Sequence, residues 1–399
     1  MKFFGTKAAR ASARPALSRG WSGGWTGGGA ALGEWPASYE AQVRAAVLGN
    51  PVAQRAVRLV CEGVGSAALS ATGGAEAEAG EADRARALAL VQARSGGQAL
   101  METLAMHLLL HGNGYVQILA GADGAPAELF ALRPERVSVE PDARGWPMAY
   151  RYRVSGSDTR LAAEDAAGRT AVIHLKNAHP LDDHYGLGCT GAAAGAVAIH
   201  NAATVWNKAL LDNAARPSGA LVHEPGADGA AMSAEQFARL KAELEAAFQG
   251  AGNAGRPMLL EGGLSWQALS LSPADMDFVG LKAAAAREIA LAFGVPPMLM
   301  GLPGDNSYAN YREANKALWR QTILPLADKI LRGIAQGLAP WMPGVALGVD
   351  LDRVAALSDE RDAQWTRVAA ADFLSAEEKR AMLGMGGESG EGLPPNRSG

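Results

Sequence analysis

A glycine-rich segment is the first pattern in this sequence whose residue types could do chemistry. Residues 186–191 fit G-x-G-x-x-G, and Asp212 lies about 20 residues further on, as in dinucleotide-binding units. In such units the glycines form a tight turn directly after a strand, and the turn holds a pyrophosphate. Here the expected strand ends near Lys176, and a segment with Pro180 intervenes. With no repeated βαβ pattern around it, the motif is interpreted as glycines at a helix start.

A second group has side chains of the types that bind metal ions. His179, Asp182, Asp183 and His184 would suit zinc or a harder cation. They fall in a loop-like segment with no further ligand pair at helical spacing. An exposed polar turn is therefore the favoured interpretation.

His107 and His111 are four residues apart on a predicted helix, a spacing found in metal sites. Leucines separate them and no H-E-x-x-H is present. We interpret them as histidines near a helix C-terminus, where the helix dipole favours positive charge.

Known catalytic motifs are missing from the sequence. It contains neither G-x-x-x-x-G-K-[ST] nor G-x-S-x-G, and Cys61 and Cys189 sit in no recognisable catalytic signature. Two cysteines cannot build a disulfide framework, so a reducing compartment is expected. The sequence predicts a protein that is not an enzyme and needs no cofactor or metal.

The composition and net charge of the chain indicate whether it could bind DNA tightly. The chain has 399 residues, 48% of them hydrophobic and 20% charged, with a formal net charge of −4. This balance is typical of folded domains. A protein that grips DNA phosphates usually carries a basic excess, so tight DNA binding is not expected. A channel through which DNA slides remains compatible, because strong attraction would slow the DNA.

The N-terminal residues and the hydropathy of the chain make a membrane role unexpected. No run reaches about 18 apolar residues, so no transmembrane helix is predicted. Residues 1–36 are rich in Gly, Ser, Ala and Arg and have no apolar core typical of a secretory signal. They are predicted to be a flexible basic arm, and an amphipathic transit peptide is the less favoured alternative.

The remaining pattern predicts an α+β fold. Asn50-Pro51 begins a helix, since asparagine is a good N-cap and proline suits the first helical position. Residues 71–85 are predicted to be a loop, and a second helix covers 98–111. Residues 115–177 alternate as strands separated by turn residues.

The second half is organised around three helices. The first covers 189–215, and the second runs from Ser272-Pro273 to Gly294. Between them lies a compact insertion, 218–271, with a helix that begins in a Ser233–Gln236 capping box. The third, about 307–338, should be kinked at Pro325, which lacks a backbone donor.

The helix over 189–215 has two stripes at helical spacing. One is apolar and is predicted to be buried, and the other is polar. The apolar stripe contains Ile199, Ala202, Val205, Trp206, Ala209 and Leu210, and the polar stripe contains His200, Thr204, Lys208 and Asp212.

Several short segments, in order, resemble the portal protein family of long-tailed phages. Together they cover roughly residues 50–385, and the Ala/Gly-rich composition is similar to portals of gene transfer agents, phage-like particles encoded by bacteria. The segments are Asn50-Pro51, Leu109–Val116, Val172–Leu175, Tyr185–Gly188, Phe293–Pro297 and Leu374–Arg380.

The resemblance implies a division of the chain into the parts of a portal subunit. These would be a β-rich wing, paired stem helices, a small α/β clip and a long proline-kinked helix. The implied parts are a flexible arm (1–36), the N-terminal wing (37–188), a stem helix (189–217), the clip (218–271), a second stem helix (272–295), the channel loop and kinked helix (296–340), a C-terminal wing or crown part (341–383) and a disordered tail (384–399).

The resemblance also implies a function and partners. Usually twelve subunits form a ring at one capsid vertex of a virion or phage-like particle, assembled in the bacterial cytoplasm. Double-stranded DNA would pass through it without sequence specificity, and a large terminase, a head–tail adaptor and the major capsid protein would dock. Another head–tail connector subunit is the alternative, and an enzyme using 179–191 the less favoured one.

Three sets of site residues follow from this assignment. Gly304, Asp305, Asn306, Ser307 and Tyr308 would form the channel loop. The polar stripe His200, Thr204, Lys208 and Asp212 would face the channel, and Glu235, Arg239, Glu243 and Arg256 of the clip would bind partners.

Overall fold

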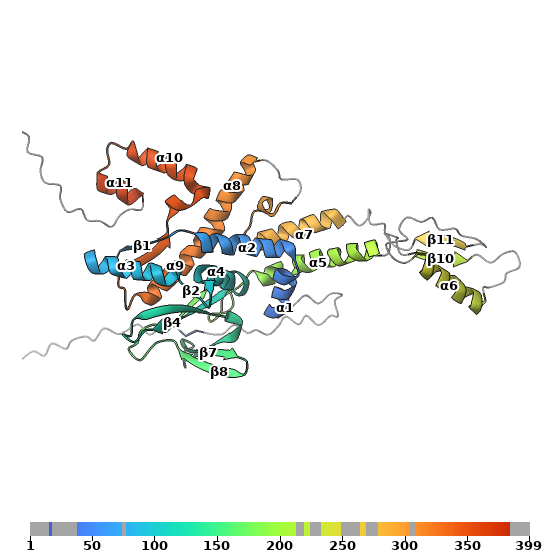
Figure 1. Ribbon diagram of the computed structural model, residues 1–399, viewed down its shortest axis with the longest axis horizontal. Helices are drawn as coiled ribbons and strands as arrows, with labels where there is room; N and C mark the ends of the chain where they lie inside the picture. The colour runs from blue at the N-terminus through green and yellow to red at the C-terminus, as the bar shows by residue number, and fades with distance from the viewer. Residues whose placement is uncertain are drawn as a thin grey trace, which may run out of the picture.

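The computed structural model describes residues 16–17, 38–73, 77–212, 219–223, 233–248, 264–268, 278–302 and 308–383. Helices and mostly antiparallel sheets form a body from which two paired helices project (Figure 1). In the described part of the chain, no helix is both long and apolar enough to cross a membrane. The predicted α+β class is confirmed.

A helical layer forms most of the main core. Asn50 caps its central helix by accepting the backbone N–H groups of Val52 and Ala53 at 3.0 Å, as the Asn50-Pro51 pattern predicts. Completely buried side chains from this helix, α4 and α9 meet in the core, among them Val60, Leu104 and Ile330. The helices of this layer are α1 (Tyr39–Val43), the π-helix η1 (Arg44–Leu48), α2 (Pro51–Ser66), α4 (Leu100–His111) and α9 (Leu324–Leu338).

Two three-stranded antiparallel sheets lie beside the helical layer. Their strand orders are β5-β4-β9 and β6-β7-β8, and a second small core lies between them around Tyr115 and Tyr150. The strands are β4 (Asn113–Ala120), β5 (Pro126–Leu132), β6 (Val137–Pro141), β7 (Pro147–Val154), β8 (Ser157–Ala162) and β9 (Val172–Lys176), with a 3-10 turn η2 (Pro134–Arg136) before β6.

Residues 77–92 form a helix, whereas the sequence predicted a loop over much of this segment. The segment read as a loop over 71–85 forms β1 (Leu69–Gly73) and most of α3 (Ala77–Gln92). Alanine and glutamate are strong helix formers, and this preference outweighs the glycines that suggested a loop. β1 pairs with β12 (Val345–Val349) near the other end of the chain, and β2 (Arg94–Ser95) and β3 (Gln98–Ala99) form a short hairpin.

The projecting helices are α5 (Thr190–Asp212) and α7 (Phe278–Ala292). Figure 1 shows them side by side, with β10, β11 and α6 beyond their outer ends. β10 (Gly219–His223) pairs with β11 (Leu264–Ala268), and α6 (Ala234–Phe248) begins in the predicted capping box: Ser233 Oγ and Gln236 Oε1 accept each other's backbone N–H. The two-helix arrangement around an insertion is as the sequence predicts.

The proline-containing helix is interrupted as expected, but by a change of helix type. A π-helix η5 (Trp319–Ile323) separates α8 (Tyr308–Leu318) from α9, directly before Pro325. Widening the turn accommodates a residue that has no N–H to donate and whose ring crowds the preceding turn. The 3-10 turns η4 (Pro297–Met300), η6 (Leu351–Arg353) and η7 (Ala355–Leu357) and helices α10 (Ser358–Ala369) and α11 (Ala376–Met382) complete the described chain.

Candidate functional site: the two-helix rod and its base

The rod consists of α5 and α7 packed as an antiparallel pair. At its outer end the rings of Trp206 and Phe278 stack, with centroids 6.0 Å apart and an angle of 26° between the planes. Along the rest of its length, buried alanines such as Ala203 on α5 and Ala286 on α7 allow the backbones to approach closely. Small side chains at the contact therefore explain why an alanine-rich sequence can form this pair.

The buried side of α5 differs from the predicted one. Ala193, Ala196, Val197, His200 and Ala203 are buried, whereas most of the predicted apolar stripe is exposed. Ile199 retains 40% of its surface exposure, Trp206 42% and Val205 69%. Alanine lines nearly every side of this helix, so side-chain hydrophobicity alone did not reveal which side packs within the subunit. In the single chain, the prediction that this stripe is buried is wrong.

His200 also lies elsewhere than on the predicted polar face. Its side chain is 7% exposed, and its Nδ1 is 3.1 Å from Asn50 Nδ2. The same amide donates to Asn201 Oδ1 at 2.8 Å, and Asn201 Nδ2 donates to the Ala45 carbonyl at 3.0 Å. Burial lowers the pKa of His200, with Lys282 adding to the shift. His200 therefore fastens α5 to the start of α2 and does not face outward in the subunit, which corrects its assignment as channel-facing.

The remaining members of the polar stripe lie further out along α5. Thr204 and Lys208 are exposed, and Thr204 Oγ1 donates to the His200 carbonyl at 2.9 Å. Asp212 is the last residue of α5. Thr204 and Lys208 are thus exposed on the outer part of the rod, whereas the His200 side chain, one turn further in, is buried.

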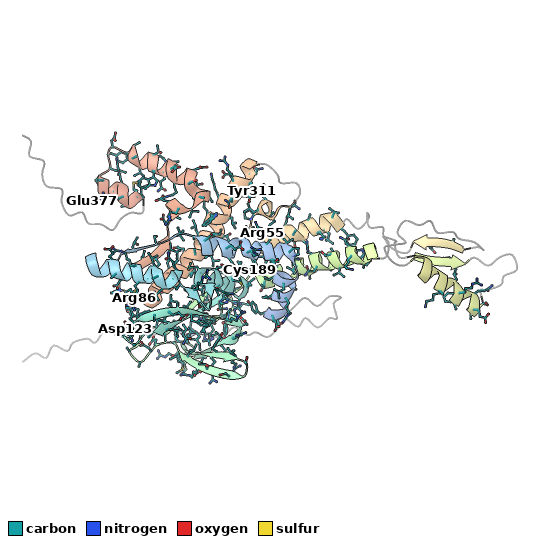
Figure 2. All side chains as sticks on the ribbon, in the orientation of Figure 1. Arg55, Arg86, Asp123, Cys189, Tyr311 and Glu377 are labelled. Atoms are coloured by element: carbon teal, nitrogen blue, oxygen red, sulfur yellow. The ribbon has the colours of Figure 1, made fainter. Side chains whose placement is uncertain are left out.

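The glycine motif lies at the base of the rod, beside the end of α4. A Cβ on Gly186 would collide with the Gly112 carbonyl oxygen and lie 2.6 Å from the Asn177 nitrogen. A Cβ on Gly188 would lie 2.6 Å from the Leu110 carbonyl carbon. These glycines let two backbones touch, and Cys189, labelled in Figure 2, donates its N–H to the Leu109 carbonyl at 2.8 Å. The motif leads into α5, as the helix-start interpretation predicts. The close backbone contact of Gly186 and Gly188, which makes the motif a packing device, was not predicted, and it fills the space that a pyrophosphate would need.

Asn113 connects this contact to the sheet. Its side chain is buried, and Oδ1 accepts the Gly186 N–H at 2.7 Å and faces His174 Nε2 at 3.1 Å. Its Nδ2 lies 3.0 Å from His111 Nδ1 and also donates to the Gly186 carbonyl. The amide therefore uses both of its ends to join α4, β9 and the segment that leads into α5. Sequence analysis missed this role, although the His-Gly-Asn-Gly run at 111–114 was the available signal.

Burial keeps the histidines around this junction neutral. It lowers the pKa of His174 to about 3, with Lys176 adding to the shift, and lowers the pKa of His107 to about 4. Burial also lowers the pKa of His111, against a smaller opposing effect of Glu135. His107 and His111 lie near the end of α4 as predicted, but the loss of solvent around them outweighs the favourable effect of the helix C-terminus.

The segment 179–184, predicted to be an exposed polar turn, is a turn held by its own side chains, but His184 is buried and its Nε2 lies 2.6 Å from the Gly145 carbonyl oxygen. Asp182 Oδ1 accepts the backbone N–H groups of His184 and Tyr185, and His179 Nδ1 accepts the N–H of Leu181. Among the residues that the structure describes, no three His, Cys, Asp or Glu side chains gather where they could hold a metal ion.

The two cysteines are poor nucleophiles. Burial raises the pKa of the Cys61 thiol to about 12 and also raises the pKa of the Cys189 thiol. A thiol attacks only as the thiolate, so neither group is activated at neutral pH.

The remaining predicted site residues are divided between described and undescribed parts of the chain. Gly304, Asp305, Asn306, Ser307 and Arg256 lie outside the described residues, and Tyr308 begins α8. Glu235 and Arg239 are exposed on α6, and Glu243 lies on the same helix. The predicted channel loop thus joins η4 to α8, and three of the four clip residues share one helix.

Comparisons with known proteins agree with this architecture. A model of the phage portal protein family matches residues 51–384. A chain in the virion of a native gene transfer agent particle is 45% identical, with a TM-score of 0.66 over 90% of this chain and 97% of that chain. A chain in the neck of such a particle, computed with C12 symmetry, is also 45% identical, with a TM-score of 0.65 over 89% of this chain and 95% of that chain.

A more distant portal protein has the same fold. The crystal structure of an HK97-family phage portal protein from Corynebacterium diphtheriae is 17% identical, with a TM-score of 0.55, and the match covers 82% of this chain and 99% of that one. This likeness is one of overall fold, and the family model supplies the assignment. This chain belongs to the phage portal protein family.

Proposed function

We propose that this chain is the portal subunit of a gene transfer agent or other phage-type particle, and that copies of it form a ring around the DNA channel at the particle's neck. One observation carries the proposal. The similarity to a chain in a neck computed with C12 symmetry covers 89% of this chain and 95% of that chain at 45% identity. By analogy with that neck, twelve is the expected number of subunits.

The division of labour within the subunit follows from the architecture. The sheets β4–β9 would lie in the wing, the α5/α7 rod would be the stem, and β10, β11 and α6 would form the clip at its outer end. The residues 303–307 and the start of α8 would form the loop nearest the DNA. The position of the clip beyond the rod supports this, because a module that docks other proteins must lie at an accessible end of the ring (Figure 1).

The charge of the chain suits a conduit. DNA carries one negative charge per about 1.7 Å, so a strongly basic wall would retain it. The chain has 37 Lys and Arg residues against 41 Asp and Glu, and the exposed polar residues Thr204 and Lys208 contribute one cation to the stem. A wall of low net charge permits double-stranded DNA to move without sequence-specific binding.

The partners would dock at the two ends of the ring. A large terminase and later a head–tail adaptor would contact the clip, where Glu235 and Arg239 are exposed on α6. The wing would contact the major capsid protein at one vertex, after assembly in the bacterial cytoplasm. The role is structural: membership of the portal family and the use of the glycine motif as a packing contact support a subunit without catalysis of its own.

Deletion of Gly304–Tyr308 tests the channel-loop part of the proposal. We expect particles that contain normal rings but package much less nuclease-protected DNA, because the loop would no longer contact the moving duplex. Ring formation is measured by electron microscopy and packaging by protected DNA per particle. Unchanged packaging in particles with intact rings would show that this loop is not the channel element.

A further inference from the structure

The first described residues of the chain, Ala16 and Leu17, lie at the turn between β6 and β7. The Leu17 N–H donates to the Arg144 carbonyl at 2.9 Å. A Cβ on Gly145 would collide with the Leu17 carbonyl oxygen and lie 2.8 Å from the Leu17 carbonyl carbon, so the two backbones touch. Part of the segment that the sequence predicts to be a flexible arm therefore lies on the sheet β6-β7-β8, and Leu17 is half-buried there.

The turn that receives Leu17 is fixed by hydrogen bonds of its own. Asp142 Oδ1 accepts the backbone N–H groups of Arg144 and Trp146, each at 2.8 Å. The Asp142 carbonyl accepts the Gly145 N–H at 3.0 Å. Gly145 has a φ of +86°, a conformation that glycine adopts without strain. None of these bonds uses the arm, so the turn holds the Arg144 carbonyl in place for a backbone donor.

His184 fixes the turn from its other side. The His184 side chain is 5% exposed, and its Nε2 lies 2.6 Å from the Gly145 carbonyl oxygen. A carbonyl oxygen only accepts, so Nε2 carries the proton of this bond. Two successive carbonyls of the turn are thus bound in different directions, that of Gly145 to the segment before α5 and that of Arg144 to Leu17.

We propose that the Asp142–Trp146 turn is a docking site for the N-terminal arm of the same subunit, and that it binds the arm through the backbone of Leu17. Main-chain hydrogen bonds supply the affinity when a sheet or its edge binds a peptide segment. Glycine at position 145 suits this use, because a side chain there would occupy the place of the arm's backbone.

Docking at this turn would determine where the charge of the arm is held. Residues 1–33 contain five Lys or Arg residues and no Asp or Glu. Figure 1 shows β7 and β8 on the far side of α2 and α4 from α8. In the ring of the proposed function, on which this consequence alone rests, the arm would be fastened on the sheet side. It would be kept away from the loop before α8, where a basic segment would retain DNA.

Hydrogen exchange of the full-length chain tests the docking site, with residue-resolved mass spectrometry as the readout. We expect the Leu17 amide to exchange slowly in the parent protein and about fivefold or more faster in Gly145→Ala, because the added Cβ displaces the arm. Gly156→Ala is the matched control and should leave the exchange of Leu17 unchanged. Gly156 has a φ of +84°, so alanine costs similar backbone strain there, but no atom lies within 4 Å of its Cβ position. Amides of β7 that stay protected in both variants show that the hairpin is folded.

Cross-linking tests the same contact without changing the turn glycine. In a full-length background with Cys61→Ala and Cys189→Ala, Leu17→Cys and Arg144→Cys are combined in one chain and treated with a short bismaleimide. We expect a link within the chain, identified by the mass of the joined peptides. Leu17→Cys with Ser157→Cys is the control and should give no link. Ser157 lies beyond the other end of β7, which has 8 residues and spans about 26 Å.

The possible failures can be told apart. A Leu17 amide that exchanges as fast in the parent as in Gly145→Ala would overturn the docking site. A ladder of joined chains from the Leu17→Cys and Arg144→Cys pair would show docking on a neighbouring copy and overturn the assignment to the same subunit. Neither measurement requires a ring, so either failure leaves the proposed function standing. Absence of rings in electron micrographs would contradict that function and leave the docking site unaffected.

Discussion

Changing Gly188 to alanine should destabilise the protein at the base of the rod. The added Cβ would lie 2.6 Å from the Leu110 carbonyl carbon and 2.8 Å from the His111 carbonyl carbon, and even closer to the Leu110 oxygen. All of these are backbone atoms, so no side chain can rotate away to make room. The backbone of α4 and the segment before α5 must then separate, which also weakens the hydrogen bond from Cys189 to Leu109.

The magnitude follows from the cost of overpacking, about 1–3 kcal/mol for a forced backbone shift. For a folded unit of roughly 300 residues, that corresponds to a thermal midpoint lower by about 2–5 °C. Gly191→Ala is the matched control within the same motif. No atom lies within 4 Å of its Cβ position, and alanine stabilises a helix by up to about 1 kcal/mol relative to glycine.

Thermal unfolding followed by circular dichroism measures both variants under one set of conditions. We expect Gly188→Ala to melt below the parent protein and Gly191→Ala to melt at the same temperature or slightly above it. A Gly188→Ala protein with the parent midpoint would refute the close backbone contact and, with it, the explanation of the glycine motif as a packing device.

Two further predictions concern the junction around Asn113. Burial depresses the pKa of His174 in the folded state to about 3 from the ordinary 6.5, so between these pH values the unfolded chain binds one proton that the folded chain does not. The free energy of unfolding should therefore fall by about 1.4 kcal/mol per pH unit as the pH drops through that window. Urea unfolding at pH 7 and pH 5 should show this loss, and His174→Gln should reduce it; an unchanged pH dependence would argue against a neutral buried histidine. Asn113→Ala should lower the free energy of unfolding by about 2–4 kcal/mol in the same assay, because it leaves the Gly186 N–H and His174 without their hydrogen-bond partner. A decrease below about 0.5 kcal/mol would contradict the hydrogen bonds described.

Local signals predicted much of the fold. The Asn50 cap, the Ser233–Gln236 box and the proline-induced break each depend on residues that are close in sequence, so their effect could be derived directly. β8 lies within the region predicted to be β, but its own residues are mostly polar and exposed and show no alternation of buried and exposed positions. Cross-strand ion pairs, such as Arg160 with Glu140 at 3.1 Å, support it instead, and these appear only when the register is known.

The site was less predictable, because its contacts join distant residues. His200 is buried by Asn50, which lies 150 positions earlier, and no periodicity in α5 signals that partner. Distant contacts also explain why the predicted apolar stripe of α5 is exposed in the subunit. An alanine-rich helix has apolar residues on several sides, so its sequence does not show which side packs. Sequence could show that two stripes exist, but only the positions of α2 and α7 decide which of them the subunit buries.

Cryo-electron microscopy of the purified full-length chain tests the central claim most directly. We expect a closed ring with an open bore, in which the α5 and α7 helices of each subunit lie side by side. A single globular particle, or a ring whose α5 and α7 helices are separated from each other, would contradict it.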